Sequence, residues 1–429
     1  MTRPLAIASG TLIALAWLAL TGWIALNCAD APAPDDRDLR LARASAAISE
    51  NGFDRLEAAA RAARLPKGEA SWDRFHAFRA GKTWEPQWIS ELVAQNAPAT
   101  ALLRTALASP AFALAPEGRA GTPAERLATL HRVQQLIALA GAQARILLRD
   151  GHSRAAIELA SLGLHVGRRI SAAENVDLLA IDMAIAFQTV SLLDLEHAVR
   201  TTHLAPDAAH TLDRLLESTR WRAEDWQRVW ALEYERLLAE VDVASERASD
   251  GSGLAWPMSL LPSAYRWHRN ETAAVLAGVY RDQLRKSAMF CAHAGLFGDG
   301  EVRWVGPPRL ADLLAPNAMG RIVISAIRSQ SFDQLQLQRC QLETHVSLVE
   351  ALIGAKAYSD AAGALPERLE DVVPRYLDAL PLDRYDGSPL HYARSAPAVY
   401  SVGEDFTDAG PGAAPSPHDL REPGLSLAF

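Results

Sequence analysis

Residues 122–151 read TPAERLATLHRVQQLIALAGAQARILLRDG, and this stretch carries the signals of one complete helix. Thr122 and Glu125 have the spacing of a capping box, in which each side chain accepts a hydrogen bond from the other residue's backbone N–H. Pro123 suits the first helical position, where the missing N–H would have no intrahelical partner. The Asp-Gly pair that follows predicts the helix end. We therefore expect a helix over residues 123–149.

Similar helical segments lie on both sides of this one. Their ends are marked by proline, Asn-Gly and Asp-Gly signals. The hairpin around Gly151 also resembles a single tetratricopeptide repeat, which suggests a repeat-like body. We expect a mainly α, multi-helix domain over residues 30–250. Its expected helices end near Leu65, start near Pro86 and Pro98, and cover residues 153–170, 174–200, 206–219 and 222–248.

An aromatic stripe lies on the last of these helices. Trp226, Trp230 and Tyr234 recur at intervals of four residues and therefore share one helix face. Such a stripe could line a ligand groove, but large aromatic side chains more commonly supply buried area in a core. We interpret the stripe as core.

The pattern loosens after residues 249–253 (SDGSG), which form the best internal linker candidate. We expect residues 251–330 to be a linker with further helices, one of them near 271–293. Glycine- and proline-rich turns occur at 298–300 and 306–308. A longer helix is expected over 331–358.

Composition and charge exclude some classes of protein. Hydrophobic residues make up 49% and charged residues 22% of the 429 residues, which is typical of a globular chain. The net charge is −8, and the arginines are scattered through the chain. Nucleic-acid-binding proteins show a basic excess or a concentrated basic patch. We therefore expect no nucleic-acid partner.

The front of the chain is strongly apolar. No charged residue occurs between Arg3 and Asp30, and residues 5–26 are long enough, at about 1.5 Å per residue, to cross a bilayer as a helix. Arg3 keeps the N-terminus in the cytoplasm by the positive-inside rule. We expect residues 1–29 to be a single-pass anchor in the inner (cytoplasmic) membrane, with a periplasmic or extracytoplasmic body.

Two alternatives to the anchor also export the body. A cleaved secretory signal is one, although its apolar region is typically about 7–15 residues, shorter than the run seen here. A lipoprotein modified at Cys28 is the other, but Asn27 is a poor match to the small residue that such a site needs. Cys291 and Cys340 are the remaining cysteines, and spacing leaves open whether they form a disulfide or stay as buried thiols.

The last part of the chain combines turn signals with short strand-like runs. Residues 365–377 read LPERLEDVVPRYL, residues 380–392 read LPLDRYDGSPLHY, and residues 400–405 read YSVGED. A hairpin is expected from 390–394 and 399–402, and an extended tail over 411–429.

These segments resemble the C-terminal part of the type II secretion major pseudopilins. The resemblance covers about residues 351–410 and implies a long helix that leads into a small antiparallel sheet, as at the tail of uncharacterised membrane-anchored envelope proteins. The amino terminus does not match the basic leader of pseudopilins, so a fibre subunit is not expected. We expect a small α+β, pseudopilin-like module over residues 331–410.

The resemblance also implies a calcium site in the acidic loop after the last strand. Asp405 and Asp408 are the matching carboxylates, and Ca²⁺ prefers six to eight oxygen ligands. Two carboxylates rarely fill such a shell alone, and a solvated acidic turn is the alternative interpretation.

No catalytic motif occurs in the sequence. Gly81-Lys82-Thr83 resembles the end of a phosphate loop, but no apolar strand precedes it. His197, His203 and His210 lack a metal-ligand pattern. The first functional hypothesis is therefore a non-enzymatic envelope protein with a binding or scaffolding role and an envelope protein partner. An envelope hydrolase, with a site assembled from distant residues, is the alternative.

Overall fold

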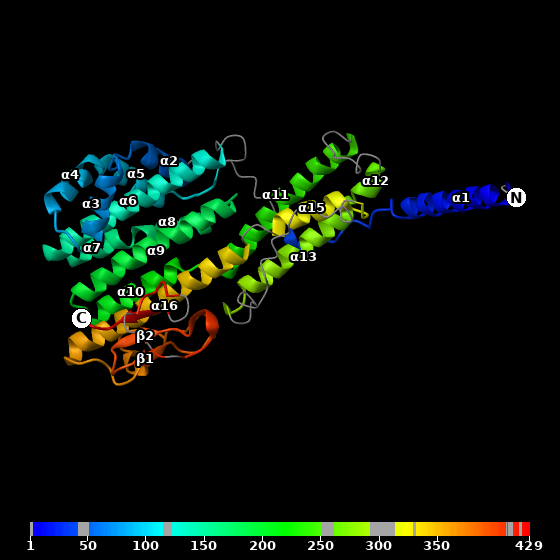
Figure 1. Cartoon of the computed structure of the whole chain (residues 1–429). Coiled ribbons are helices and arrows are strands. Elements are labelled where there is room, and N and C mark those ends of the chain that lie inside the picture. Colours follow the sequence, from blue (N-terminus) through cyan, green and yellow to red (C-terminus); the bar gives the residue numbers. More distant parts are fainter. Residues whose placement is uncertain are drawn as a thin grey trace. The chain divides into compact units, whose positions relative to one another are not determined.

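The computed structural model is mainly helical and has a small three-stranded sheet (Figure 1). It describes residues 3–41, 51–114, 122–250, 261–291, 314–328, 332–408, 410, 415–419 and 423–429. The turns expected at 298–300 and 306–308 lie outside these residues.

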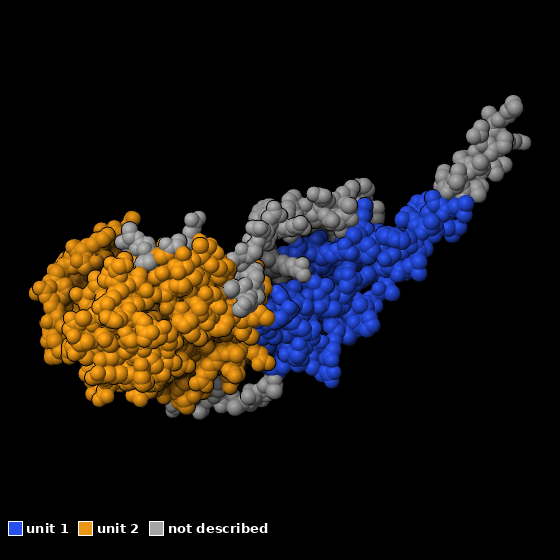
Figure 2. Space-filling view, turned by 90° about the horizontal axis from the view of Figure 1, so that it is seen from below, with its two compact units in different colours: residues 1–42, 230–285, 299–332 blue, residues 43–229, 286–298, 333–429 orange. Residues whose placement is uncertain are grey.

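The chain divides into two compact units, coloured separately in Figure 2. Unit 1 consists of residues 1–42, 230–285 and 299–332, and unit 2 of residues 43–229, 286–298 and 333–429. Three of the boundaries, after residues 229, 285 and 332, fall within the long helices α11 (Ala223–Asp250), α13 (Arg269–Ser287) and α16 (Phe332–Ala362). The other two, after residues 42 and 298, fall outside the described residues.

Unit 2 contains most of the helices that the sequence predicted between residues 51 and 219. Thr122 and Glu125 form the expected capping box at the start of α6, and the helix ends at Arg149 as expected. α10 also has its expected bounds. The helices of this part are α2 (Gly52–Ala62), α3 (Glu69–Arg79), α4 (Pro86–Gln95), α5 (Ala97–Leu107), α6 (Pro123–Arg149), α7 (Ser153–Ala160), α8 (Leu162–Ser171), α9 (Leu178–Thr201) and α10 (Pro206–Thr219).

α9 is the central helix of unit 2 and packs against α6, α7 and α8. Phe187, Leu192 and Leu195 on α9 are fully buried. Among the described residues, α9 is the helix long and apolar enough to cross a membrane, and 61% of its apolar window is buried inside the protein. Its apolar composition is therefore explained by its place in the core.

A buried ion pair also holds α9. Arg79 Nη2 on α3 lies 2.8 Å from Asp194 Oδ2, and Asp194 is only 3% exposed. Burial raises the pKa of Asp194, while the positive charge of Arg79 opposes that rise. Gly141 on α6 leaves room for this carboxylate, because a Cβ there would lie 1.8 Å from Asp194 Oδ2.

The segment expected as one helix over 153–170 is two helices. α7 ends at Ala160, Ser161 separates it from α8, and Gly163 then lies against α9. A Cβ on Gly163 would lie 2.4 Å from the Phe187 carbonyl oxygen. This close tertiary contact was not visible in the local pattern.

Unit 1 has an aromatic core and contains α1 (Arg3–Leu26), α12 (Ser263–Arg266) and α15 (Ala318–Arg328). Trp230 and Tyr234 are fully buried against Tyr280, with ring centroids 6.2 and 5.8 Å away. Trp226, in unit 2, is 2% exposed. The interpretation as core is therefore confirmed for Trp230 and Tyr234, whereas Trp226 is buried and also lines a pocket of unit 2.

The segment after α1 is bound tightly to α13. Asp30 accepts hydrogen bonds from the backbone N–H groups of Asn270 and Glu271 and so caps the first turn of α13. His268 Nε2 lies 3.0 Å from the Asn27 carbonyl oxygen, and Arg281 forms an ion pair with Asp38 in the short helix η1 (Arg37–Leu39). The base of α1 is thus fixed within unit 1.

The end of unit 2 contains the sheet. β1 (His391–Ala393) and β2 (Ala398–Tyr400) pair antiparallel as the predicted hairpin, with Tyr392 opposite Val399. β3 (Gly424–Ser426) pairs with the other edge of β2. β3 lies in the segment expected as an extended tail. The short helices η4 (Leu369–Val372) and η5 (Gly403–Asp405) flank the hairpin in sequence.

Candidate functional site

A pocket in unit 2 is lined by three arginines and two tryptophans. Its walls come from α8, α9, the α10–α11 connection, α16 and the segment before β1. The cavity holds about 70 Å³, which is room for a small polar group. Its lining residues are Leu164, Gln188, Thr219, Arg220, Trp221, Trp226, Arg339, Leu342, Glu343, Val346 and Arg384.

Gln188 fixes the aromatic wall of the pocket. This side chain is 2% exposed and donates hydrogen bonds to the carbonyl oxygens of Leu164 (3.2 Å) and Thr219 (3.0 Å). Its Oε1 accepts a hydrogen bond of 2.7 Å from Trp221 Nε1. All the polar atoms of Gln188 are therefore used to position the backbone and the indole ring.

The two tryptophans form a pair at the start of α11. The ring centroids of Trp221 and Trp226 lie 4.8 Å apart. Asp225 Oδ2 accepts a hydrogen bond from the backbone N–H of Arg222. The same oxygen lies 2.5 Å from Arg168 Nη1, with which it forms an ion pair. A carboxylate in the first turn stabilises the helix N-terminus, so the pair is held on a fixed helix end.

Arg220 is anchored to a buried carboxylate. Its Nη2 lies 2.5 Å from Glu350 Oε2 on α16, and its Nε lies 2.9 Å from Glu217 Oε2. Burial raises the pKa of Glu350 to about 7, although the positive charge of Arg220 opposes the rise. The guanidinium of Arg220 is therefore held in place beside the pocket.

Arg384 brings a partly buried positive charge to the pocket. Its Nε is buried and has no hydrogen-bond partner among the described residues. Burial lowers the pKa of Arg384 and the nearby charge of Arg220 lowers it further, while the negative charges of three glutamates (Glu343, Glu350 and Glu217) oppose the fall. A buried guanidinium N–H without an acceptor costs free energy, and an anion in the pocket would supply that acceptor.

Arg339 lines the pocket and precedes Cys340 of the disulfide in sequence. This residue is 4% exposed and donates hydrogen bonds to the backbone carbonyl oxygens of Lys286, Ser287 and Met289. It also donates to Glu343 Oε1 at 3.5 Å. Arg339 thus ties the end of α13 to α16.

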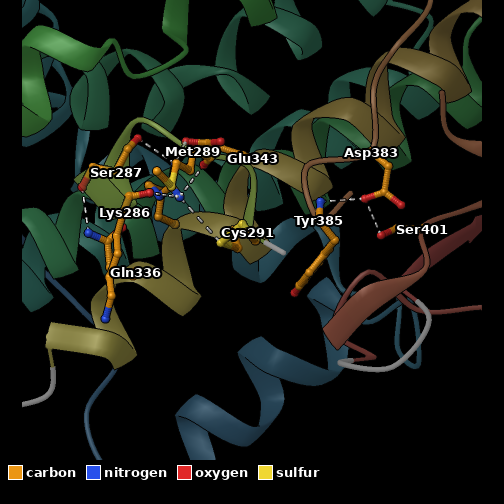
Figure 3. The surroundings of a disulfide bond; sticks show 11 residues. Lys286, Ser287, Met289, Cys291, Gln336, Glu343, Asp383, Tyr385 and Ser401 are labelled. Carbon is orange, nitrogen blue, oxygen red and sulfur yellow. Dashed lines mark hydrogen bonds and ion pairs between the residues drawn. A yellow bond between two sulfur atoms is a disulfide. The ribbon is translucent and has the colours of Figure 1, made fainter. Parts of the chain in front are cut away.

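A disulfide joins Cys291 to Cys340, with the two Cα atoms 6.2 Å apart. The open choice between a bridge and two thiols is therefore settled for the bridge. Both cysteines are buried and pack with Tyr385 and Val402. Figure 3 shows the disulfide at Cys291, with Tyr385 on the same side as Asp383 and Ser401. The disulfide adds a covalent link between the segment after α13 and α16.

Asp383 organises the segment that carries Arg384. This carboxylate is fully buried and accepts hydrogen bonds from Ser401 Oγ (2.8 Å) and from the backbone N–H groups of Tyr385 and Val402 (2.9 Å each). Burial raises the pKa of Asp383, while these hydrogen bonds oppose the rise. These hydrogen bonds attach the segment that carries Arg384 to Ser401 and Val402, which directly follow β2.

The three arginines that line the pocket outnumber its one carboxylate, Glu343, which favours an anion as a ligand. Guanidinium groups recognise carboxylate and phosphate through paired hydrogen bonds, and indole rings supply flat apolar contact. A hydrolase site would need a nucleophile, a base and an orienting residue close together. Among the described residues that line this pocket, the hydroxyl of Thr219 donates to the Leu216 carbonyl oxygen and Glu343 accepts from Arg339, and no histidine, serine, cysteine or aspartate completes such a set.

The calcium candidates lie on the η5 side of the sheet. Asp408 accepts a hydrogen bond from Tyr400 Oη (3.0 Å), and its Oδ2 lies 3.2 Å from His391 Nδ1. Asp405 accepts a hydrogen bond from the Thr407 N–H. Within the described ranges, neither residue belongs to a group of three metal-binding side chains.

Such a group does occur elsewhere in unit 2. It consists of His210, Asp213 and Asp378. Of the histidines considered in the sequence, His203 is exposed, and burial lowers the pKa of His197 to about 4. The sequence did not single out Asp213 or Asp378.

The pocket arginines were also missed in the sequence. Arg220, Arg339 and Arg384 come from three distant segments and belong to no motif. The one local indication in the sequence was that Arg220 precedes Trp221. An arginine beside a tryptophan does not by itself indicate a binding pocket. No protein-family model or curated protein matches the sequence, and no solved structure matches the fold.

Proposed function

We propose that this chain is a membrane-anchored extracytoplasmic protein that binds an acidic partner in the cell envelope. The observation that carries the proposal is the surface of α1. Leu15, Trp17, Leu18, Leu20, Trp23 and Leu26 are between 46% and 81% exposed. A helix that presents apolar side chains to its surroundings is suited to lipid, because exposing that area to water is unfavourable.

The length and flanking charges of α1 support the anchor. α1 covers Arg3–Leu26, and residues 5–26 would contact the bilayer. The part of its apolar run with described side chains, Ala14–Leu26, is by itself shorter than a span. Arg3 on one side and the acidic segment from Asp30 on the other favour a cytoplasmic N-terminus.

The disulfide supports an extracytoplasmic body. Disulfides persist in the periplasm and outside cells, and are rare in the reducing cytosol. The pair Cys291–Cys340 is buried, so it has the character of a structural bridge. A single-pass anchor with this topology places unit 2 on the oxidising side.

The arginine pocket supports a binding role. Arg384 offers a buried N–H without an acceptor, beside Arg220 and the Trp221–Trp226 pair. The matching ligand group is a carboxylate or phosphate on a protein or small molecule of the envelope. We favour this binding role over a hydrolase because of the residues that line the pocket.

We also propose that residues 331–410 form a pseudopilin-like module. The order of α16 followed by the β1–β2 hairpin supports this proposal. Calcium at Asp405 and Asp408 would belong to the same proposal, with Tyr400 and His391 as competing partners of Asp408. Calcium binding by the full-length protein, compared with Asp405→Asn, tests that site.

The anchor is tested by extracting membranes with alkaline carbonate. The full-length chain is expected to stay in the membrane pellet. The double substitution Leu15→Arg/Leu18→Arg is expected to release it or prevent insertion, because each arginine costs about 2.5–3.5 kcal/mol at a helix centre. The matched control Leu15→Ala/Leu18→Ala should remain in the pellet. Quantitative release of the wild-type chain would contradict an integral anchor.

The pocket is tested by titrating the full-length protein with acetate and with inorganic phosphate. Saturable binding of at least one anion is expected, and Arg384→Gln is expected to weaken it at least tenfold. The control Arg154→Gln removes a guanidinium that is 95% exposed on α7 and should leave binding unchanged. No saturable binding, or equal binding by both variants, would contradict the pocket's role.

A further inference from the structure

His210 and Asp213 present their side chains on one face of α10, three residues apart. Asp378 faces them from the loop between η4 and β1. The ligand atoms of the three side chains all lie within 4.8 Å of one another. All three residues belong to unit 2, and they lie outside the set that lines the arginine pocket.

The contacts of His210 define which ring nitrogen is available. Its Nε2 lies 3.1 Å from the Arg375 carbonyl oxygen, which only accepts hydrogen bonds. Nε2 must therefore carry the hydrogen. In the neutral ring, Nδ1 then bears a lone pair, although it lies 3.1 Å from Asp378 Oδ1. That contact is favourable only with a proton or a metal ion between the two atoms.

A backbone carbonyl on the second ring nitrogen is typical of histidines that bind metals. Such a hydrogen bond fixes the ring orientation and makes the ligating nitrogen more basic. The Arg375 carbonyl supplies this contact to His210 from outside the group of three.

The two carboxylates also favour a cation. Asp213 Oδ2 accepts a hydrogen bond from the backbone N–H of Asp378 at 3.1 Å, so the two acidic residues are held close together. A bound cation would offset the repulsion between these two neighbouring negative charges.

We propose that His210, Asp213 and Asp378 bind a divalent transition-metal ion, with Zn²⁺ the best match. One imidazole nitrogen and two carboxylate oxygens are common ligands of Zn²⁺, and a water molecule would take the fourth position. Ligand atoms at about 2.0–2.1 Å from a tetrahedral Zn²⁺ lie roughly 3.4 Å from one another. The three ligand atoms, now within 4.8 Å of one another, must therefore move slightly closer together when the ion binds. Asp378, whose side chain is 69% exposed, has the freedom to do so.

The site would join α10 to the loop that precedes β1. The metal ion would therefore stabilise the attachment of the C-terminal segment to the helical body within unit 2. This inference does not rest on the proposed function, because it needs neither the membrane anchor nor the arginine pocket.

The test is isothermal titration of the full-length, untagged protein with ZnCl₂ in detergent after removal of metals by EDTA. One Zn²⁺ per chain is expected. Asp213→Asn and His210→Ala are each expected to weaken binding at least tenfold. Asp207→Asn makes the same chemical change at an exposed position of α10 and should bind like the wild type.

Two further measurements keep the test decisive. Circular dichroism should show that Asp213→Asn folds like the wild type, and Co²⁺ should give the intense visible absorption of a tetrahedral site in the wild type only. Zn²⁺ binding that is unchanged in both Asp213→Asn and His210→Ala would overturn the proposal. So would a wild-type protein that binds no Zn²⁺, because His210 would then be bridged to Asp378 by a proton alone.

Discussion

Removing the disulfide is expected to destabilise unit 2 strongly. Cys291 and Cys340 are separated by 49 residues, and the bridge closes this loop in the unfolded chain as well as in the folded one. The chain-entropy relation gives an unfolded-state restriction worth about 4 kcal/mol for a loop of this length. Because both cysteines are buried in the cluster with Tyr385 and Val402, packing losses in a Cys291→Ala/Cys340→Ala variant would add to this value.

The assay is urea denaturation of the full-length protein in detergent, followed by tryptophan fluorescence with and without a reductant. The wild type is expected to lose about 4 kcal/mol when reduced, whereas the double variant should be insensitive to the reductant. Cys28→Ser is the matched control, because Cys28 is outside the bridge and should leave the response to reductant intact. Equal midpoints for oxidised and reduced wild type would refute the reasoning, as would two alkylatable thiols at positions 291 and 340 in the native protein.

Three further substitutions test packing and electrostatics in unit 2. Gly141→Ala is expected to lower the free energy of unfolding by about 3 kcal/mol, because its Cβ must displace the Asp194 carboxylate; an unchanged denaturation midpoint would contradict the close approach. Glu350→Gln is expected to flatten the pH dependence of stability. Burial raises the pKa of Glu350 from 4.5 to about 7 in the folded state, so its contribution to the free energy of unfolding is complete below pH 4.5 and is lost as the pH rises through 7. The loss is at most about 3 kcal/mol. Denaturation below pH 4.5 and above pH 7 should show this loss in the wild type and not in Glu350→Gln. Thr122→Ala removes the cap of α6 and should cost about 1 kcal/mol in the same assay, and a neutral result would show that the capping box does not contribute.

Local signals predicted much of the helical body. The capping box at Thr122 and the proline at position 206 mark helix starts in the sequence, because caps depend on neighbouring residues only. The β1–β2 hairpin was predicted for the same reason, since its strands are joined by a short turn. The pairing of β3 with β2 depends on residues more than 20 positions apart, and no local pattern specifies it.

The candidate sites depend on tertiary structure and were not predictable in this way. Arg220 and Arg384 meet at one pocket only because the segment before β1 packs near the end of α10. His210 was noted in the sequence, but its partner Asp378 comes from a loop 168 positions later. A sequence without a known motif gives no means of pairing such residues.

The topology of α1 is the central claim, and a reporter fused behind Phe429 tests it most directly. An enzyme that becomes active only after export is expected to be active at this position. A reporter that works only in the reducing cytosol should be silent in the same fusion. Activity of the cytosolic reporter, with the exported one silent, would contradict the anchored topology and the oxidising environment inferred for the Cys291–Cys340 disulfide.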